Sequence, residues 1–418
     1  MTKIWHPFTQ HGLGQTIPKI TRAQDAILYT QDGREIIDGI SSWWVQTHGH
    51  CHPQIVAAIQ QQSAQLDQII FAGWTHEPAQ ILADGLAEFL PKSLDHIFFS
   101  DSGSTAVEVA LKMALGYWHN RGEQRHHILV MDHSYHGDTI GAMSVGARGV
   151  FNQAYGPLLF DVSAVPFPKP DAVQATLDAL TAACRDPDNR PAAFIVEPLV
   201  LGAGGMLTYA PTILAEMRNI CSAHDVLFIA DEVMTGWGRT GTIFACEQAG
   251  IEPDILCMAK GLTGGVVPLA VTAATTPIFD AHYSPDRSKM FFHSSSFTAN
   301  PIACAAANAN LEIWRNQPVQ KRIDHIVQRH AQFAEQLQRY DSTTNVRQCG
   351  TILVFEIADS HGHYMSTLGP ELLRFFAEEN VLLRPLGNTV YIMPPYCITD
   401  AQLSRIYTVV EAAIDEFA

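Results

Sequence analysis

Two side chains able to act together stand at the ends of two apolar segments. The run 226–230 ends in Asp231, and the run 255–259 ends in Lys260. Their separation is typical of one helix-containing crossover between parallel strands, which would bring both side chains to one edge of a sheet. A lysine at the dry end of a buried strand is costly unless it is paired, neutralised or used covalently.

A Schiff base to an aldehyde would use this lysine covalently. The aspartate would then suit the pyridinium nitrogen of the aldehyde's ring, whose positive charge makes the ring an electron sink. A structural ion pair between Asp231 and Lys260 is the alternative that the spacing alone leaves open.

A third feature could bind an anion. The segment Asp101-Ser-Gly-Ser-Thr105 follows the apolar run 96–100 and precedes a helical stretch. A Gly-Ser turn at a helix N-terminus offers free N–H groups, hydroxyl donors and the positive end of the helix dipole, which together suit phosphate. An ordinary helix cap, with Glu108 in the first turn, is the alternative. Anchors for phosphate, pyridinium and aldehyde at neighbouring strand ends together indicate pyridoxal 5′-phosphate (PLP).

The segment Gly236-Trp-Gly-Arg-Thr-Gly241 matches the G-x-G-x-x-G pattern of dinucleotide-binding proteins. That interpretation requires a helix at the glycines and an acidic residue at the end of the next strand, which instead ends in Lys260. We expect the glycines to form a loop over the rim of the active site. An NAD-linked oxidoreductase and a non-catalytic binding protein of the same fold remain as rival functions.

The histidine-rich tract His48-Gly-His-Cys-His52 resembles a metal site in composition. Its residues stand too close together to form one tetrahedral ligand set, and no second pair follows at a zinc-ligand spacing. We therefore expect a glycine-containing loop near the site and no metal.

Three aromatic residues stand beside these motifs. Trp43 and Trp44 could belong to the core or to the wall of an apolar pocket, and their position in the sequence does not decide between the two. Tyr135 follows the apolar run 128–131, where its ring could stack on a planar cofactor or pack in the interior.

Short apolar segments alternate with helix-period segments over most of the chain and predict an α/β fold, a mostly parallel sheet wrapped by helices. The expected strands are His96–Ser100, Ile128–Met131, Ala193–Val196, Val226–Ala230 and Ile255–Met258, and the expected helices are Thr105–Asn120, Asp171–Cys184, Ala210–His224 and Pro301–Trp314. In such sheets ligands bind beyond the carboxyl ends of the strands, where the motifs above lie.

The C-terminal region predicts a smaller α+β domain. Its expected elements are helices at 319–340, 369–379 and 400–417 and strands at 351–357, 381–384 and 389–393. A hairpin pattern at 26–38 could pack against it. The expected division is an N-terminal segment, 1–41, that packs with the small domain, a large cofactor-binding domain, 42–315, and the small domain, 316–418.

Composition limits the classes of partner. The chain has 418 residues, 47% of them hydrophobic and 16% charged, and its formal net charge is −16. This acidic balance argues against nucleic acid or an anionic membrane surface as a main partner. We see no apolar run long enough to span a membrane, no secretory signal and no C-x-x-C pair among the eight cysteines. We expect a cytoplasmic protein with reduced thiols.

These motifs together make the chain similar to the class III aminotransferases of PLP fold type I. The resemblance covers nearly the whole chain and rests on the segments Asp101–Glu108, Tyr135–Asp138, Ile195–Pro198, Ala230–Val233, Gly236–Gly241 and Ala259–Gly261. It implies a PLP-dependent transamination in two half-reactions that share one site, a large domain with a mostly parallel sheet, and a smaller α+β domain.

Further segments narrow the resemblance to one branch of the family. They are Trp5–Thr9, Ser41–Trp44, Gly141–Ser144, Asn300–Ala305 and Arg384–Tyr396. This branch transfers an amino group from S-adenosylmethionine to 8-amino-7-oxononanoate and makes 7,8-diaminononanoate in biotin synthesis. Lysine as the donor, an ω-amino acid:oxo-acid aminotransferase and a related aminomutase are the alternatives.

The resemblance implies roles around the cofactor. Lys260 would form the Schiff base and move the substrate proton as general acid and base, and Asp231 would keep the pyridine nitrogen protonated. The other residues expected to contact the cofactor are Gly103 and Ser104 at the phosphate, Tyr135 and Val233 on the two faces of the ring, and Glu197 nearby.

The same resemblance implies the substrate contacts. Arg384 would clamp the carboxylate of the oxo acid, because guanidinium geometry matches a carboxylate. Trp43 and Trp44 would line the pocket for its aliphatic chain, beside Tyr135 and Lys260. The family forms homodimers in which each site borrows a loop from the other subunit. Here that loop is His293–Phe297, with Ser295 and Ser296 at the phosphate and Ser294 at the substrate.

Two positions depart from the pattern of this branch. The borrowed loop reads Ser294-Ser-Ser296 where relatives have Gly-Pro-Thr, and Phe8 stands where relatives often have tyrosine. Ser296 keeps a hydroxyl for the phosphate, whereas Phe8 lacks a phenol that could help to hold the amino donor.

Overall fold

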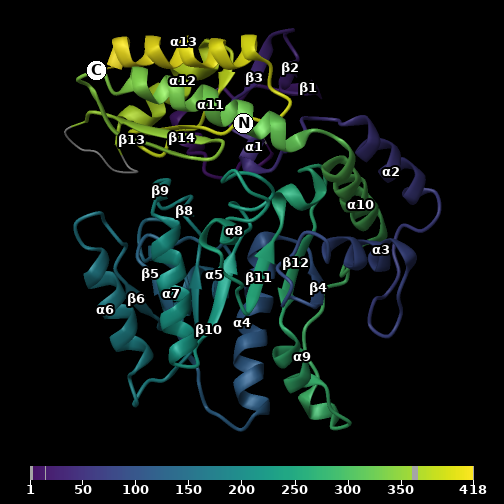
Figure 1. Cartoon of the computed structure of the whole chain (residues 1–418). Helices are drawn as coiled ribbons and strands as arrows, with labels where there is room; N and C mark the ends of the chain where they lie inside the picture. The colour runs from purple at the N-terminus through teal and green to yellow at the C-terminus, as the bar shows by residue number, and fades with distance from the viewer. Residues whose placement is uncertain (1–2, 15, 360–365, 418) are drawn as a thin grey trace.

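A computed structural model describes residues 3–14, 16–359 and 366–417 and arranges them in a larger and a smaller part (Figure 1). The larger part, drawn in blue to green, surrounds a seven-stranded sheet. The smaller part combines the purple N-terminal strands with the yellow-green C-terminal elements. Segments from the two ends of the chain therefore lie side by side.

The central sheet has the strand order β4-β12-β11-β10-β7-β5-β6. Its strands are β4 (His96–Ser100), β5 (His127–Met131), β6 (Ser163–Val165), β7 (Pro191–Val196), β10 (Leu227–Asp231), β11 (Ile255–Met258) and β12 (Ala270–Ala274). Neighbours from β11 to β6 run parallel, whereas β12 is antiparallel to both β11 and β4. The sequence pattern predicts five of these strands and misses β6, which is very short, and β12, whose alanines favour a helix as much as a strand.

The inner strands of this sheet are buried on both faces, as their continuous apolar sequences predict, whereas the edge strands β4 and β6 are only partly buried. In β7, Phe194 and Val196 pack into one cluster of buried side chains, and Ala193 and Ile195 pack into another. The helices of the larger part are α2 (Pro53–Ser63), α3 (Glu77–Leu86), α4 (Gly103–Asn120), α5 (Ile140–Ser144), α6 (Val173–Cys184), α7 (Pro211–Ala223), α8 (Cys246–Ala249), α9 (Thr276–His282) and α10 (Pro301–Asn316). The predicted helices correspond to α4, α6, α7 and α10.

The smaller part contains two sheets. One consists of β13 (Thr343–Cys349), β14 (Ile352–Ile357) and β16 (Thr389–Ile392), accompanied by α11 (Val319–Leu337), α12 (Leu368–Glu378) and α13 (Asp400–Phe417). The other has the order β1 (Ile20–Gln24), β2 (Ile27–Thr30), β3 (Glu35–Asp38) and β15 (Val381–Leu382). Because β3 pairs in parallel with β15, the predicted N-terminal hairpin is attached to the C-terminal region. The pattern misses β1 and β13, which are largely polar.

The connection between β10 and β11 contains a helix, as predicted, but a much shorter one than the spacing suggests. The two strands are adjacent and parallel, but the segment 232–254 contains only the four-residue helix α8. No helix opens at Gly236–Gly241, so the context that a dinucleotide site requires is absent there. The prediction that this loop covers the rim is also wrong, because Trp237 and Arg239 are buried and neither lines the cavity described below.

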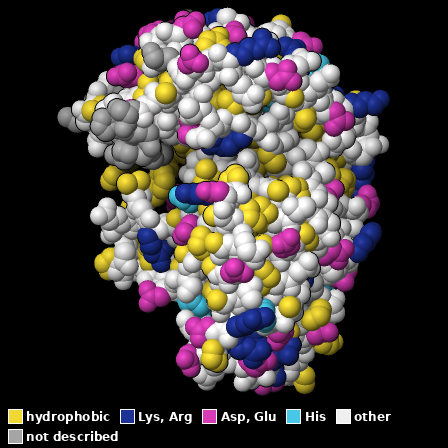
Figure 2. All heavy atoms as spheres, turned by 60° about the vertical axis from the view of Figure 1, so that its left-hand side comes forward, with side chains coloured by type: hydrophobic (Ala, Val, Ile, Leu, Met, Phe, Trp, Pro, Cys, Tyr) yellow, Lys and Arg dark blue, Asp and Glu magenta, His cyan; other side chains and the backbone are white. Residues whose placement is uncertain are grey.

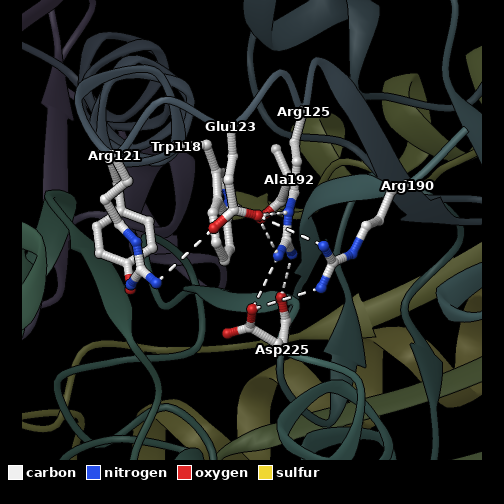
Figure 3. Close-up of polar contacts among 8 residues, drawn as sticks. Trp118, Arg121, Glu123, Arg125, Arg190, Ala192 and Asp225 are labelled. Atoms are coloured by element: carbon white, nitrogen blue, oxygen red, sulfur yellow. Dashed lines mark hydrogen bonds and ion pairs between the residues drawn. The ribbon is translucent and has the colours of Figure 1, made fainter.

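An ion network centred on a buried arginine connects the starts of three neighbouring strands (Figure 3). The guanidinium of Arg125, which is 2% exposed, lies 3.3 Å from the centre of the Trp118 ring. It pairs with Glu123 at 2.7 Å and with Asp225 at 2.8 Å, and Arg190 reaches the same two carboxylates. These residues precede β5, β7 and β10, so the network lies at the end of the sheet opposite the carboxyl ends of the strands.

The surface is chemically mixed. Figure 2 shows acidic, basic and hydrophobic side chains side by side, with hydrophobic groups gathered at the left between the upper and lower parts. In the described part of the chain, no helix combines the length and the apolar character needed to cross a membrane. Nor do three or more His, Cys, Asp or Glu side chains of the described ranges come together in a way that could hold a metal ion.

Candidate active site

A cavity of about 660 Å³ lies where the carboxyl ends of β10 and β11 face the smaller part of the molecule. Its lining includes most residues that the sequence predicts for the site: Trp43, Trp44, Gly103, Ser104, Tyr135, Glu197, Asp231, Val233, Lys260 and Arg384. They meet because adjacent parallel strands end at one edge of the sheet, which is where ligands bind in such folds.

Lys260 is the first residue of a tight 3₁₀ turn, Lys260–Thr263, that directly follows β11. Its φ of +47° is left-handed, a conformation that costs a non-glycine residue free energy and that clusters at functional sites. Burial lowers the pKa of its amine to about 8, and the carboxylates of Asp231 and Glu197 oppose this shift. The nitrogen Nζ stands 4.7 Å from the centre of the Trp44 ring. Such an amine is partly neutral near pH 8 and can act as a nucleophile.

Asp231 ends β10 and is buried. Its Oδ2 lies 2.7 Å from Nδ1 of His136, and its Oδ1 accepts the backbone N–H of Val233 at 3.1 Å. The alternative of a structural ion pair is wrong. In the part of the chain that the structure describes, the carboxylate of Asp231 pairs with His136, and the amine of Lys260 does not come within 4.0 Å of it. This contact of His136 is not predicted from the sequence, and its position inside the Tyr135–Asp138 motif is the only signal that could have indicated it.

Glu197 holds the segment that carries Tyr135. Its Oε2 accepts the N–H of Tyr135 and its Oε1 accepts the N–H of Gly202, both at 2.9 Å. Burial raises the pKa of Glu197 to about 7 and raises the pKa of the Tyr135 phenol well above its usual value. The phenol is therefore neutral at physiological pH and keeps its proton as a hydrogen-bond donor.

The first turn of α4 forms another part of the wall. The hydroxyl of Ser102 accepts the N–H of Thr105 at 3.3 Å, and the hydroxyl of Thr105 accepts the N–H of Ser102 at 2.8 Å. A Cβ at Gly103 would stand 2.6 Å from Val233, so glycine permits this close approach. The N–H groups of Gly103 and Ser104 have no acceptor within the helix, as in any first turn. The alternative of a helix cap is confirmed for Ser102 and Thr105, but Glu108 lies beyond the first turn and accepts hydrogen bonds from Thr139 and Gly141. The cap leaves the N–H groups of the turn open to an anion.

Aromatic rings and one guanidinium form the mouth of the cavity. The rings of Phe8 and Trp43 meet edge to face with 5.6 Å between centres. Arg384 lies 5.5 Å from the centre of the Trp43 ring and donates to the carbonyl oxygen of Phe8 at 3.2 Å. Trp43 is 42% exposed, whereas Trp44 is buried in the core and still lines the cavity. Trp44 therefore belongs both to the core and to the wall of the cavity, whereas Trp43 belongs only to the wall.

The histidine tract is a loop that supports the segments beside the cavity. Nε2 of His50 lies 2.8 Å from Oδ2 of Asp38, and Nε2 of His48 lies 2.9 Å from Oδ1 of Asn310. Asp38 also accepts the backbone N–H of Ser42, the residue before the two tryptophans. The tract thus makes hydrogen bonds near the site, as the loop interpretation predicts.

The loop with Ser294, Ser295 and Ser296 lies apart from the cavity of its own chain. None of these serines lines the cavity, and the backbone carbonyl of Ser296 accepts a hydrogen bond from Gln68 at 2.5 Å. Ser294 and Ser296 are exposed, and so is the neighbouring ring of Phe297.

Comparison with known proteins identifies the family, since the family model for aminotransferase class III matches residues 8–414. The chain belongs to the class III aminotransferases. Within this family it is 45% identical to the adenosylmethionine-8-amino-7-oxononanoate aminotransferase of Synechococcus elongatus, over 99% of this chain and 98% of the relative. It is 34% identical to the enzyme of that name from Geobacter sulfurreducens, over 98% of this chain and 95% of the relative.

Solved structures of aminotransferases have the same fold. The adenosylmethionine-8-amino-7-oxononanoate aminotransferase of Methanocaldococcus jannaschii gives a TM-score of 0.95 at 31% identity, covering 99% of this chain and 97% of that one. An amine transaminase from an uncultivated Pseudomonas species, in a PLP-bound form, gives 0.92 at 30% identity and covers 100% and 99%. The family resemblance and the α/β fold predicted from the sequence are confirmed.

The cavity of this class III aminotransferase fits a phosphorylated pyridine aldehyde. The amine of Lys260 could bind the aldehyde, the buried carboxylate of Asp231 could face a protonated ring nitrogen, and the first turn of α4 offers N–H groups to a phosphate. Nε2 of His136 is buried and has no hydrogen-bond partner among the residues that the structure describes. These features match the groups of PLP in kind and number.

Proposed function

We propose that this aminotransferase uses PLP to move an amino group from S-adenosylmethionine to 8-amino-7-oxononanoate, giving 7,8-diaminononanoate for biotin synthesis. The observation that carries the proposal is the meeting of three groups in one cavity: an amine of lowered pKa at Lys260, a buried acid at Asp231 and the open first turn of α4. The names of relatives from Synechococcus, Geobacter and Methanocaldococcus support the choice of substrates.

Each side chain around the cofactor has one task in this proposal. Lys260 attaches the aldehyde and afterwards holds or moves the substrate proton at Nζ. Asp231, oriented by His136, stabilises a proton on the ring nitrogen, while Gly103 and Ser104 bind the phosphate. When bound, PLP supplies a positively charged ring that withdraws electrons from the substrate carbon.

Three further residues place the ring. Tyr135 and Val233 would cover its two faces, and Glu197 would keep Tyr135 there by accepting its backbone N–H. The pairing of Glu197 with two N–H donors at 2.9 Å supports this, because both donors sit on loops that would otherwise be free to shift.

The mouth of the cavity suits an oxo acid with a long aliphatic chain. Arg384 offers a guanidinium to the carboxylate, and the indole rings of Trp43 and Trp44 offer apolar surface to the methylene groups. The carbonyl of Phe8 holds Arg384 at this position with a hydrogen bond of 3.2 Å. We propose that this contact orients the guanidinium toward an incoming acceptor.

A second candidate function is that of an amine or ω-amino acid:oxo-acid aminotransferase. The match to an amine transaminase at a TM-score of 0.92 and 30% identity favours it, because the fold and the lysine-bearing turn would serve both reactions. The same acceptor with lysine as the donor is a variant of the first proposal. These candidates share the cofactor and differ only in what the mouth of the cavity accepts.

The half-reaction decides between these candidates. PLP-loaded protein is mixed with S-adenosylmethionine, lysine or a simple amine, and conversion of the cofactor to its amine form is followed by absorbance. The amine form is then isolated and given 8-amino-7-oxononanoate, and the product is identified by mass spectrometry. We expect conversion by S-adenosylmethionine and formation of 7,8-diaminononanoate. If 8-amino-7-oxononanoate does not react with the amine form of the cofactor, whichever donor produced it, the first candidate is contradicted and the second is favoured.

We propose further that the enzyme is a cytoplasmic homodimer with shared sites, in which the loop with Ser294, Ser295 and Ser296 completes the cavity of the partner. The separation of these serines from their own chain's cavity supports this, as does the exposure of Phe292 and Phe297 on the same loop. Exposed aromatic rings of this kind are typical of surfaces that another chain covers. All eight cysteines are free, which suits a reducing compartment.

A further inference from the structure

One buried amide holds the turn that presents Lys260. Asn310, in the middle of α10, is 0% exposed, and its Nδ2 donates to the carbonyl oxygens of Gly261 at 3.1 Å and Leu262 at 3.0 Å. Its Oδ1 lies 2.9 Å from Nε2 of His48, which is also buried. These three contacts use both N–H groups of the amide and its oxygen.

The chemistry of the partners decides which atom donates. Carbonyl oxygens only accept, so Nδ2 of Asn310 must face the turn and Oδ1 must face His48. An amide oxygen also only accepts, and His48 must therefore carry its proton on Nε2. Burial lowers the pKa of His48 to about 3, so the ring is neutral, and its Nδ1 is buried without a partner in the described part of the chain. The histidine thus locks the amide in one orientation.

The segment before His48 holds the same turn from a second side. The N–H of Thr47 donates to the carbonyl of Gly264 at 3.3 Å, and Nε2 of Gln46 donates to the carbonyl of Gly265 at 3.2 Å. These bonds hold the end of the turn, whereas Asn310 holds the two residues next to Lys260. A residue with φ of +47° keeps that conformation only if its surroundings enforce it.

We propose that Asn310, oriented by His48, is a positioning residue for Lys260, and that it fixes the strained turn so that Nζ stands at one place in the cavity. Neither Asn310 nor His48 lines the cavity, so both act through the backbone of the turn and touch neither substrate nor cofactor. The inference rests on the proposed function only in taking Lys260 as the residue that captures the aldehyde.

This arrangement answers a chemical need. The same nitrogen must capture the aldehyde and later take and return a proton, so its position must suit both steps. A misplacement of about 1 Å can cost about 10²-fold in rate. The side-chain amide of Asn310, bonded to two backbone carbonyls of the turn, can provide that precision without adding a polar group to the cavity.

The experiment compares two asparagines of one helix. Asn310→Leu removes the three contacts, and the control Asn308→Leu removes a bond from Asn308 to the carbonyl of Pro78 at 2.9 Å, outside the turn. For each protein the cofactor-free form is treated with pyridoxal and borohydride, and the rate of labelling at Lys260 is mapped by mass spectrometry. The PLP-loaded forms are then compared in kcat and KM. We expect Asn310→Leu to lower the labelling rate and kcat by about 10- to 100-fold with KM little changed. Asn308→Leu should stay near the parent protein.

A second pair of variants tests the role of His48 directly. His48→Gln keeps an N–H donor near the place of Nε2, and His48→Leu removes it. We expect His48→Gln to restore most of the labelling rate, and His48→Leu to resemble Asn310→Leu. This pair also decides the matter if Asn310→Leu does not fold.

Three results would overturn the inference. They are parental labelling and kcat in folded Asn310→Leu, equal losses in Asn310→Leu and Asn308→Leu, and a His48→Gln protein that behaves like His48→Leu. Failure of the proposed function would look different, because the parent protein itself would then capture no aldehyde at Lys260.

Discussion

The amine of Lys260 shares the cavity with the carboxyl groups of Asp231 and Glu197, and these two carboxylates partly offset the effect of burial on the pKa of the lysine. Burial lowers the pKa of the lysine to about 8 and raises that of Glu197 to about 7. Both residues can therefore exchange a proton close to neutral pH, which is a property of groups that take part in acid–base chemistry. His136 fixes the orientation of the neighbouring carboxylate of Asp231 with a hydrogen bond of 2.7 Å.

The lowered pKa of Lys260 predicts the pH dependence of its reactivity. Labelling of cofactor-free protein at this residue should rise with pH and reach half its maximum near pH 8, because the neutral amine is the nucleophile. Between pH 8 and the usual lysine value of 10.5 the unfolded chain binds more protons at this site than the folded protein. Stability from this group therefore increases with pH across that window.

Competitive labelling followed by peptide mapping measures the midpoint, and Lys260→Ala serves as the control that loses the signal. A midpoint near 10.5 would contradict the effect of burial. In the PLP-loaded enzyme, Lys260→Ala should abolish turnover altogether.

Arg384 permits a second prediction at the residue scale. Arg384→Ala should raise KM for the oxo acid by about 10²-fold, because a charge-assisted bond to a carboxylate contributes about 1.5–3 kcal/mol. The half-reaction with the amino donor should change much less. Arg384→Lys keeps the charge but loses the forked geometry, so its KM for the oxo acid should lie between those of the parent protein and Arg384→Ala. Equal losses in both half-reactions would argue against a carboxylate clamp.

At the scale of elements, the two ends of the sheet do different work. The carboxyl ends of β10 and β11 carry the polar groups of the cavity, and the N-terminal ends of β5, β7 and β10 are held together by the ion network of Arg125 (Figure 3). None of the residues of the network lines the cavity, so we expect the network to contribute to stability and not to the chemistry of the site.

Removal of Arg125 should therefore lower stability without changing the chemistry. Arg125→Leu deletes a buried guanidinium that stacks on Trp118 and makes charge-assisted hydrogen bonds to Glu123 and Asp225, and we expect a loss of about 1–3 kcal/mol in the free energy of unfolding. The matched control Arg190→Leu removes a side chain that is 50% exposed and pairs with the same carboxylates. It should cost less than about 1 kcal/mol.

Urea unfolding of the two cofactor-free proteins measures the difference, and kcat at 25 °C should stay unchanged in both. Equal losses of stability would show that burial of Arg125 does not matter. A fall in kcat for Arg125→Leu alone would show that the network reaches the cavity.

At the scale of the whole molecule, both ends of the chain build the part that closes the cavity. β3 pairs with β15, the ring of Phe8 contacts that of Trp43, and Arg384 donates a hydrogen bond to the carbonyl oxygen of Phe8. Residues almost the whole chain apart thus form one wall. In our proposal, the exposed loop with Ser294, Ser295 and Ser296 adds a further wall to the cavity of a second chain.

If the sites are shared between subunits, two inactive variants should complement each other in a mixed dimer. Lys260→Ala should inactivate its own site, and Ser296→Asp should repel the phosphate of the partner's cofactor by like charge. A mixed dimer of the two variants would contain one site with both residues intact. We expect activity to appear after the two inactive proteins are mixed under conditions that exchange subunits. If Ser296 acted within its own chain, the mixture would remain inactive.

The chain's own pattern was sufficient to predict the residues at the strand ends. Apolar runs that stop at Asp231 and Lys260 indicate buried parallel strands, and a Gly-Ser turn before a helix indicates a helix N-terminus that could bind an anion, because both signals are local. The family motifs extended the list to Tyr135, Glu197 and Arg384, all of which line the cavity. Their roles, the serine loop and the division at residues 41 and 315 remain predictions.

Tertiary structure alone decided the remaining features. β12 is a strand because its alanine-rich segment lies between two partners that supply backbone hydrogen bonds, which override its local preference. His136 faces Asp231, and Asn310 holds the turn of Lys260, through contacts between residues far apart in the chain. No local pattern encodes such pairs, since a buried polar group finds its partner only when the fold brings the two together.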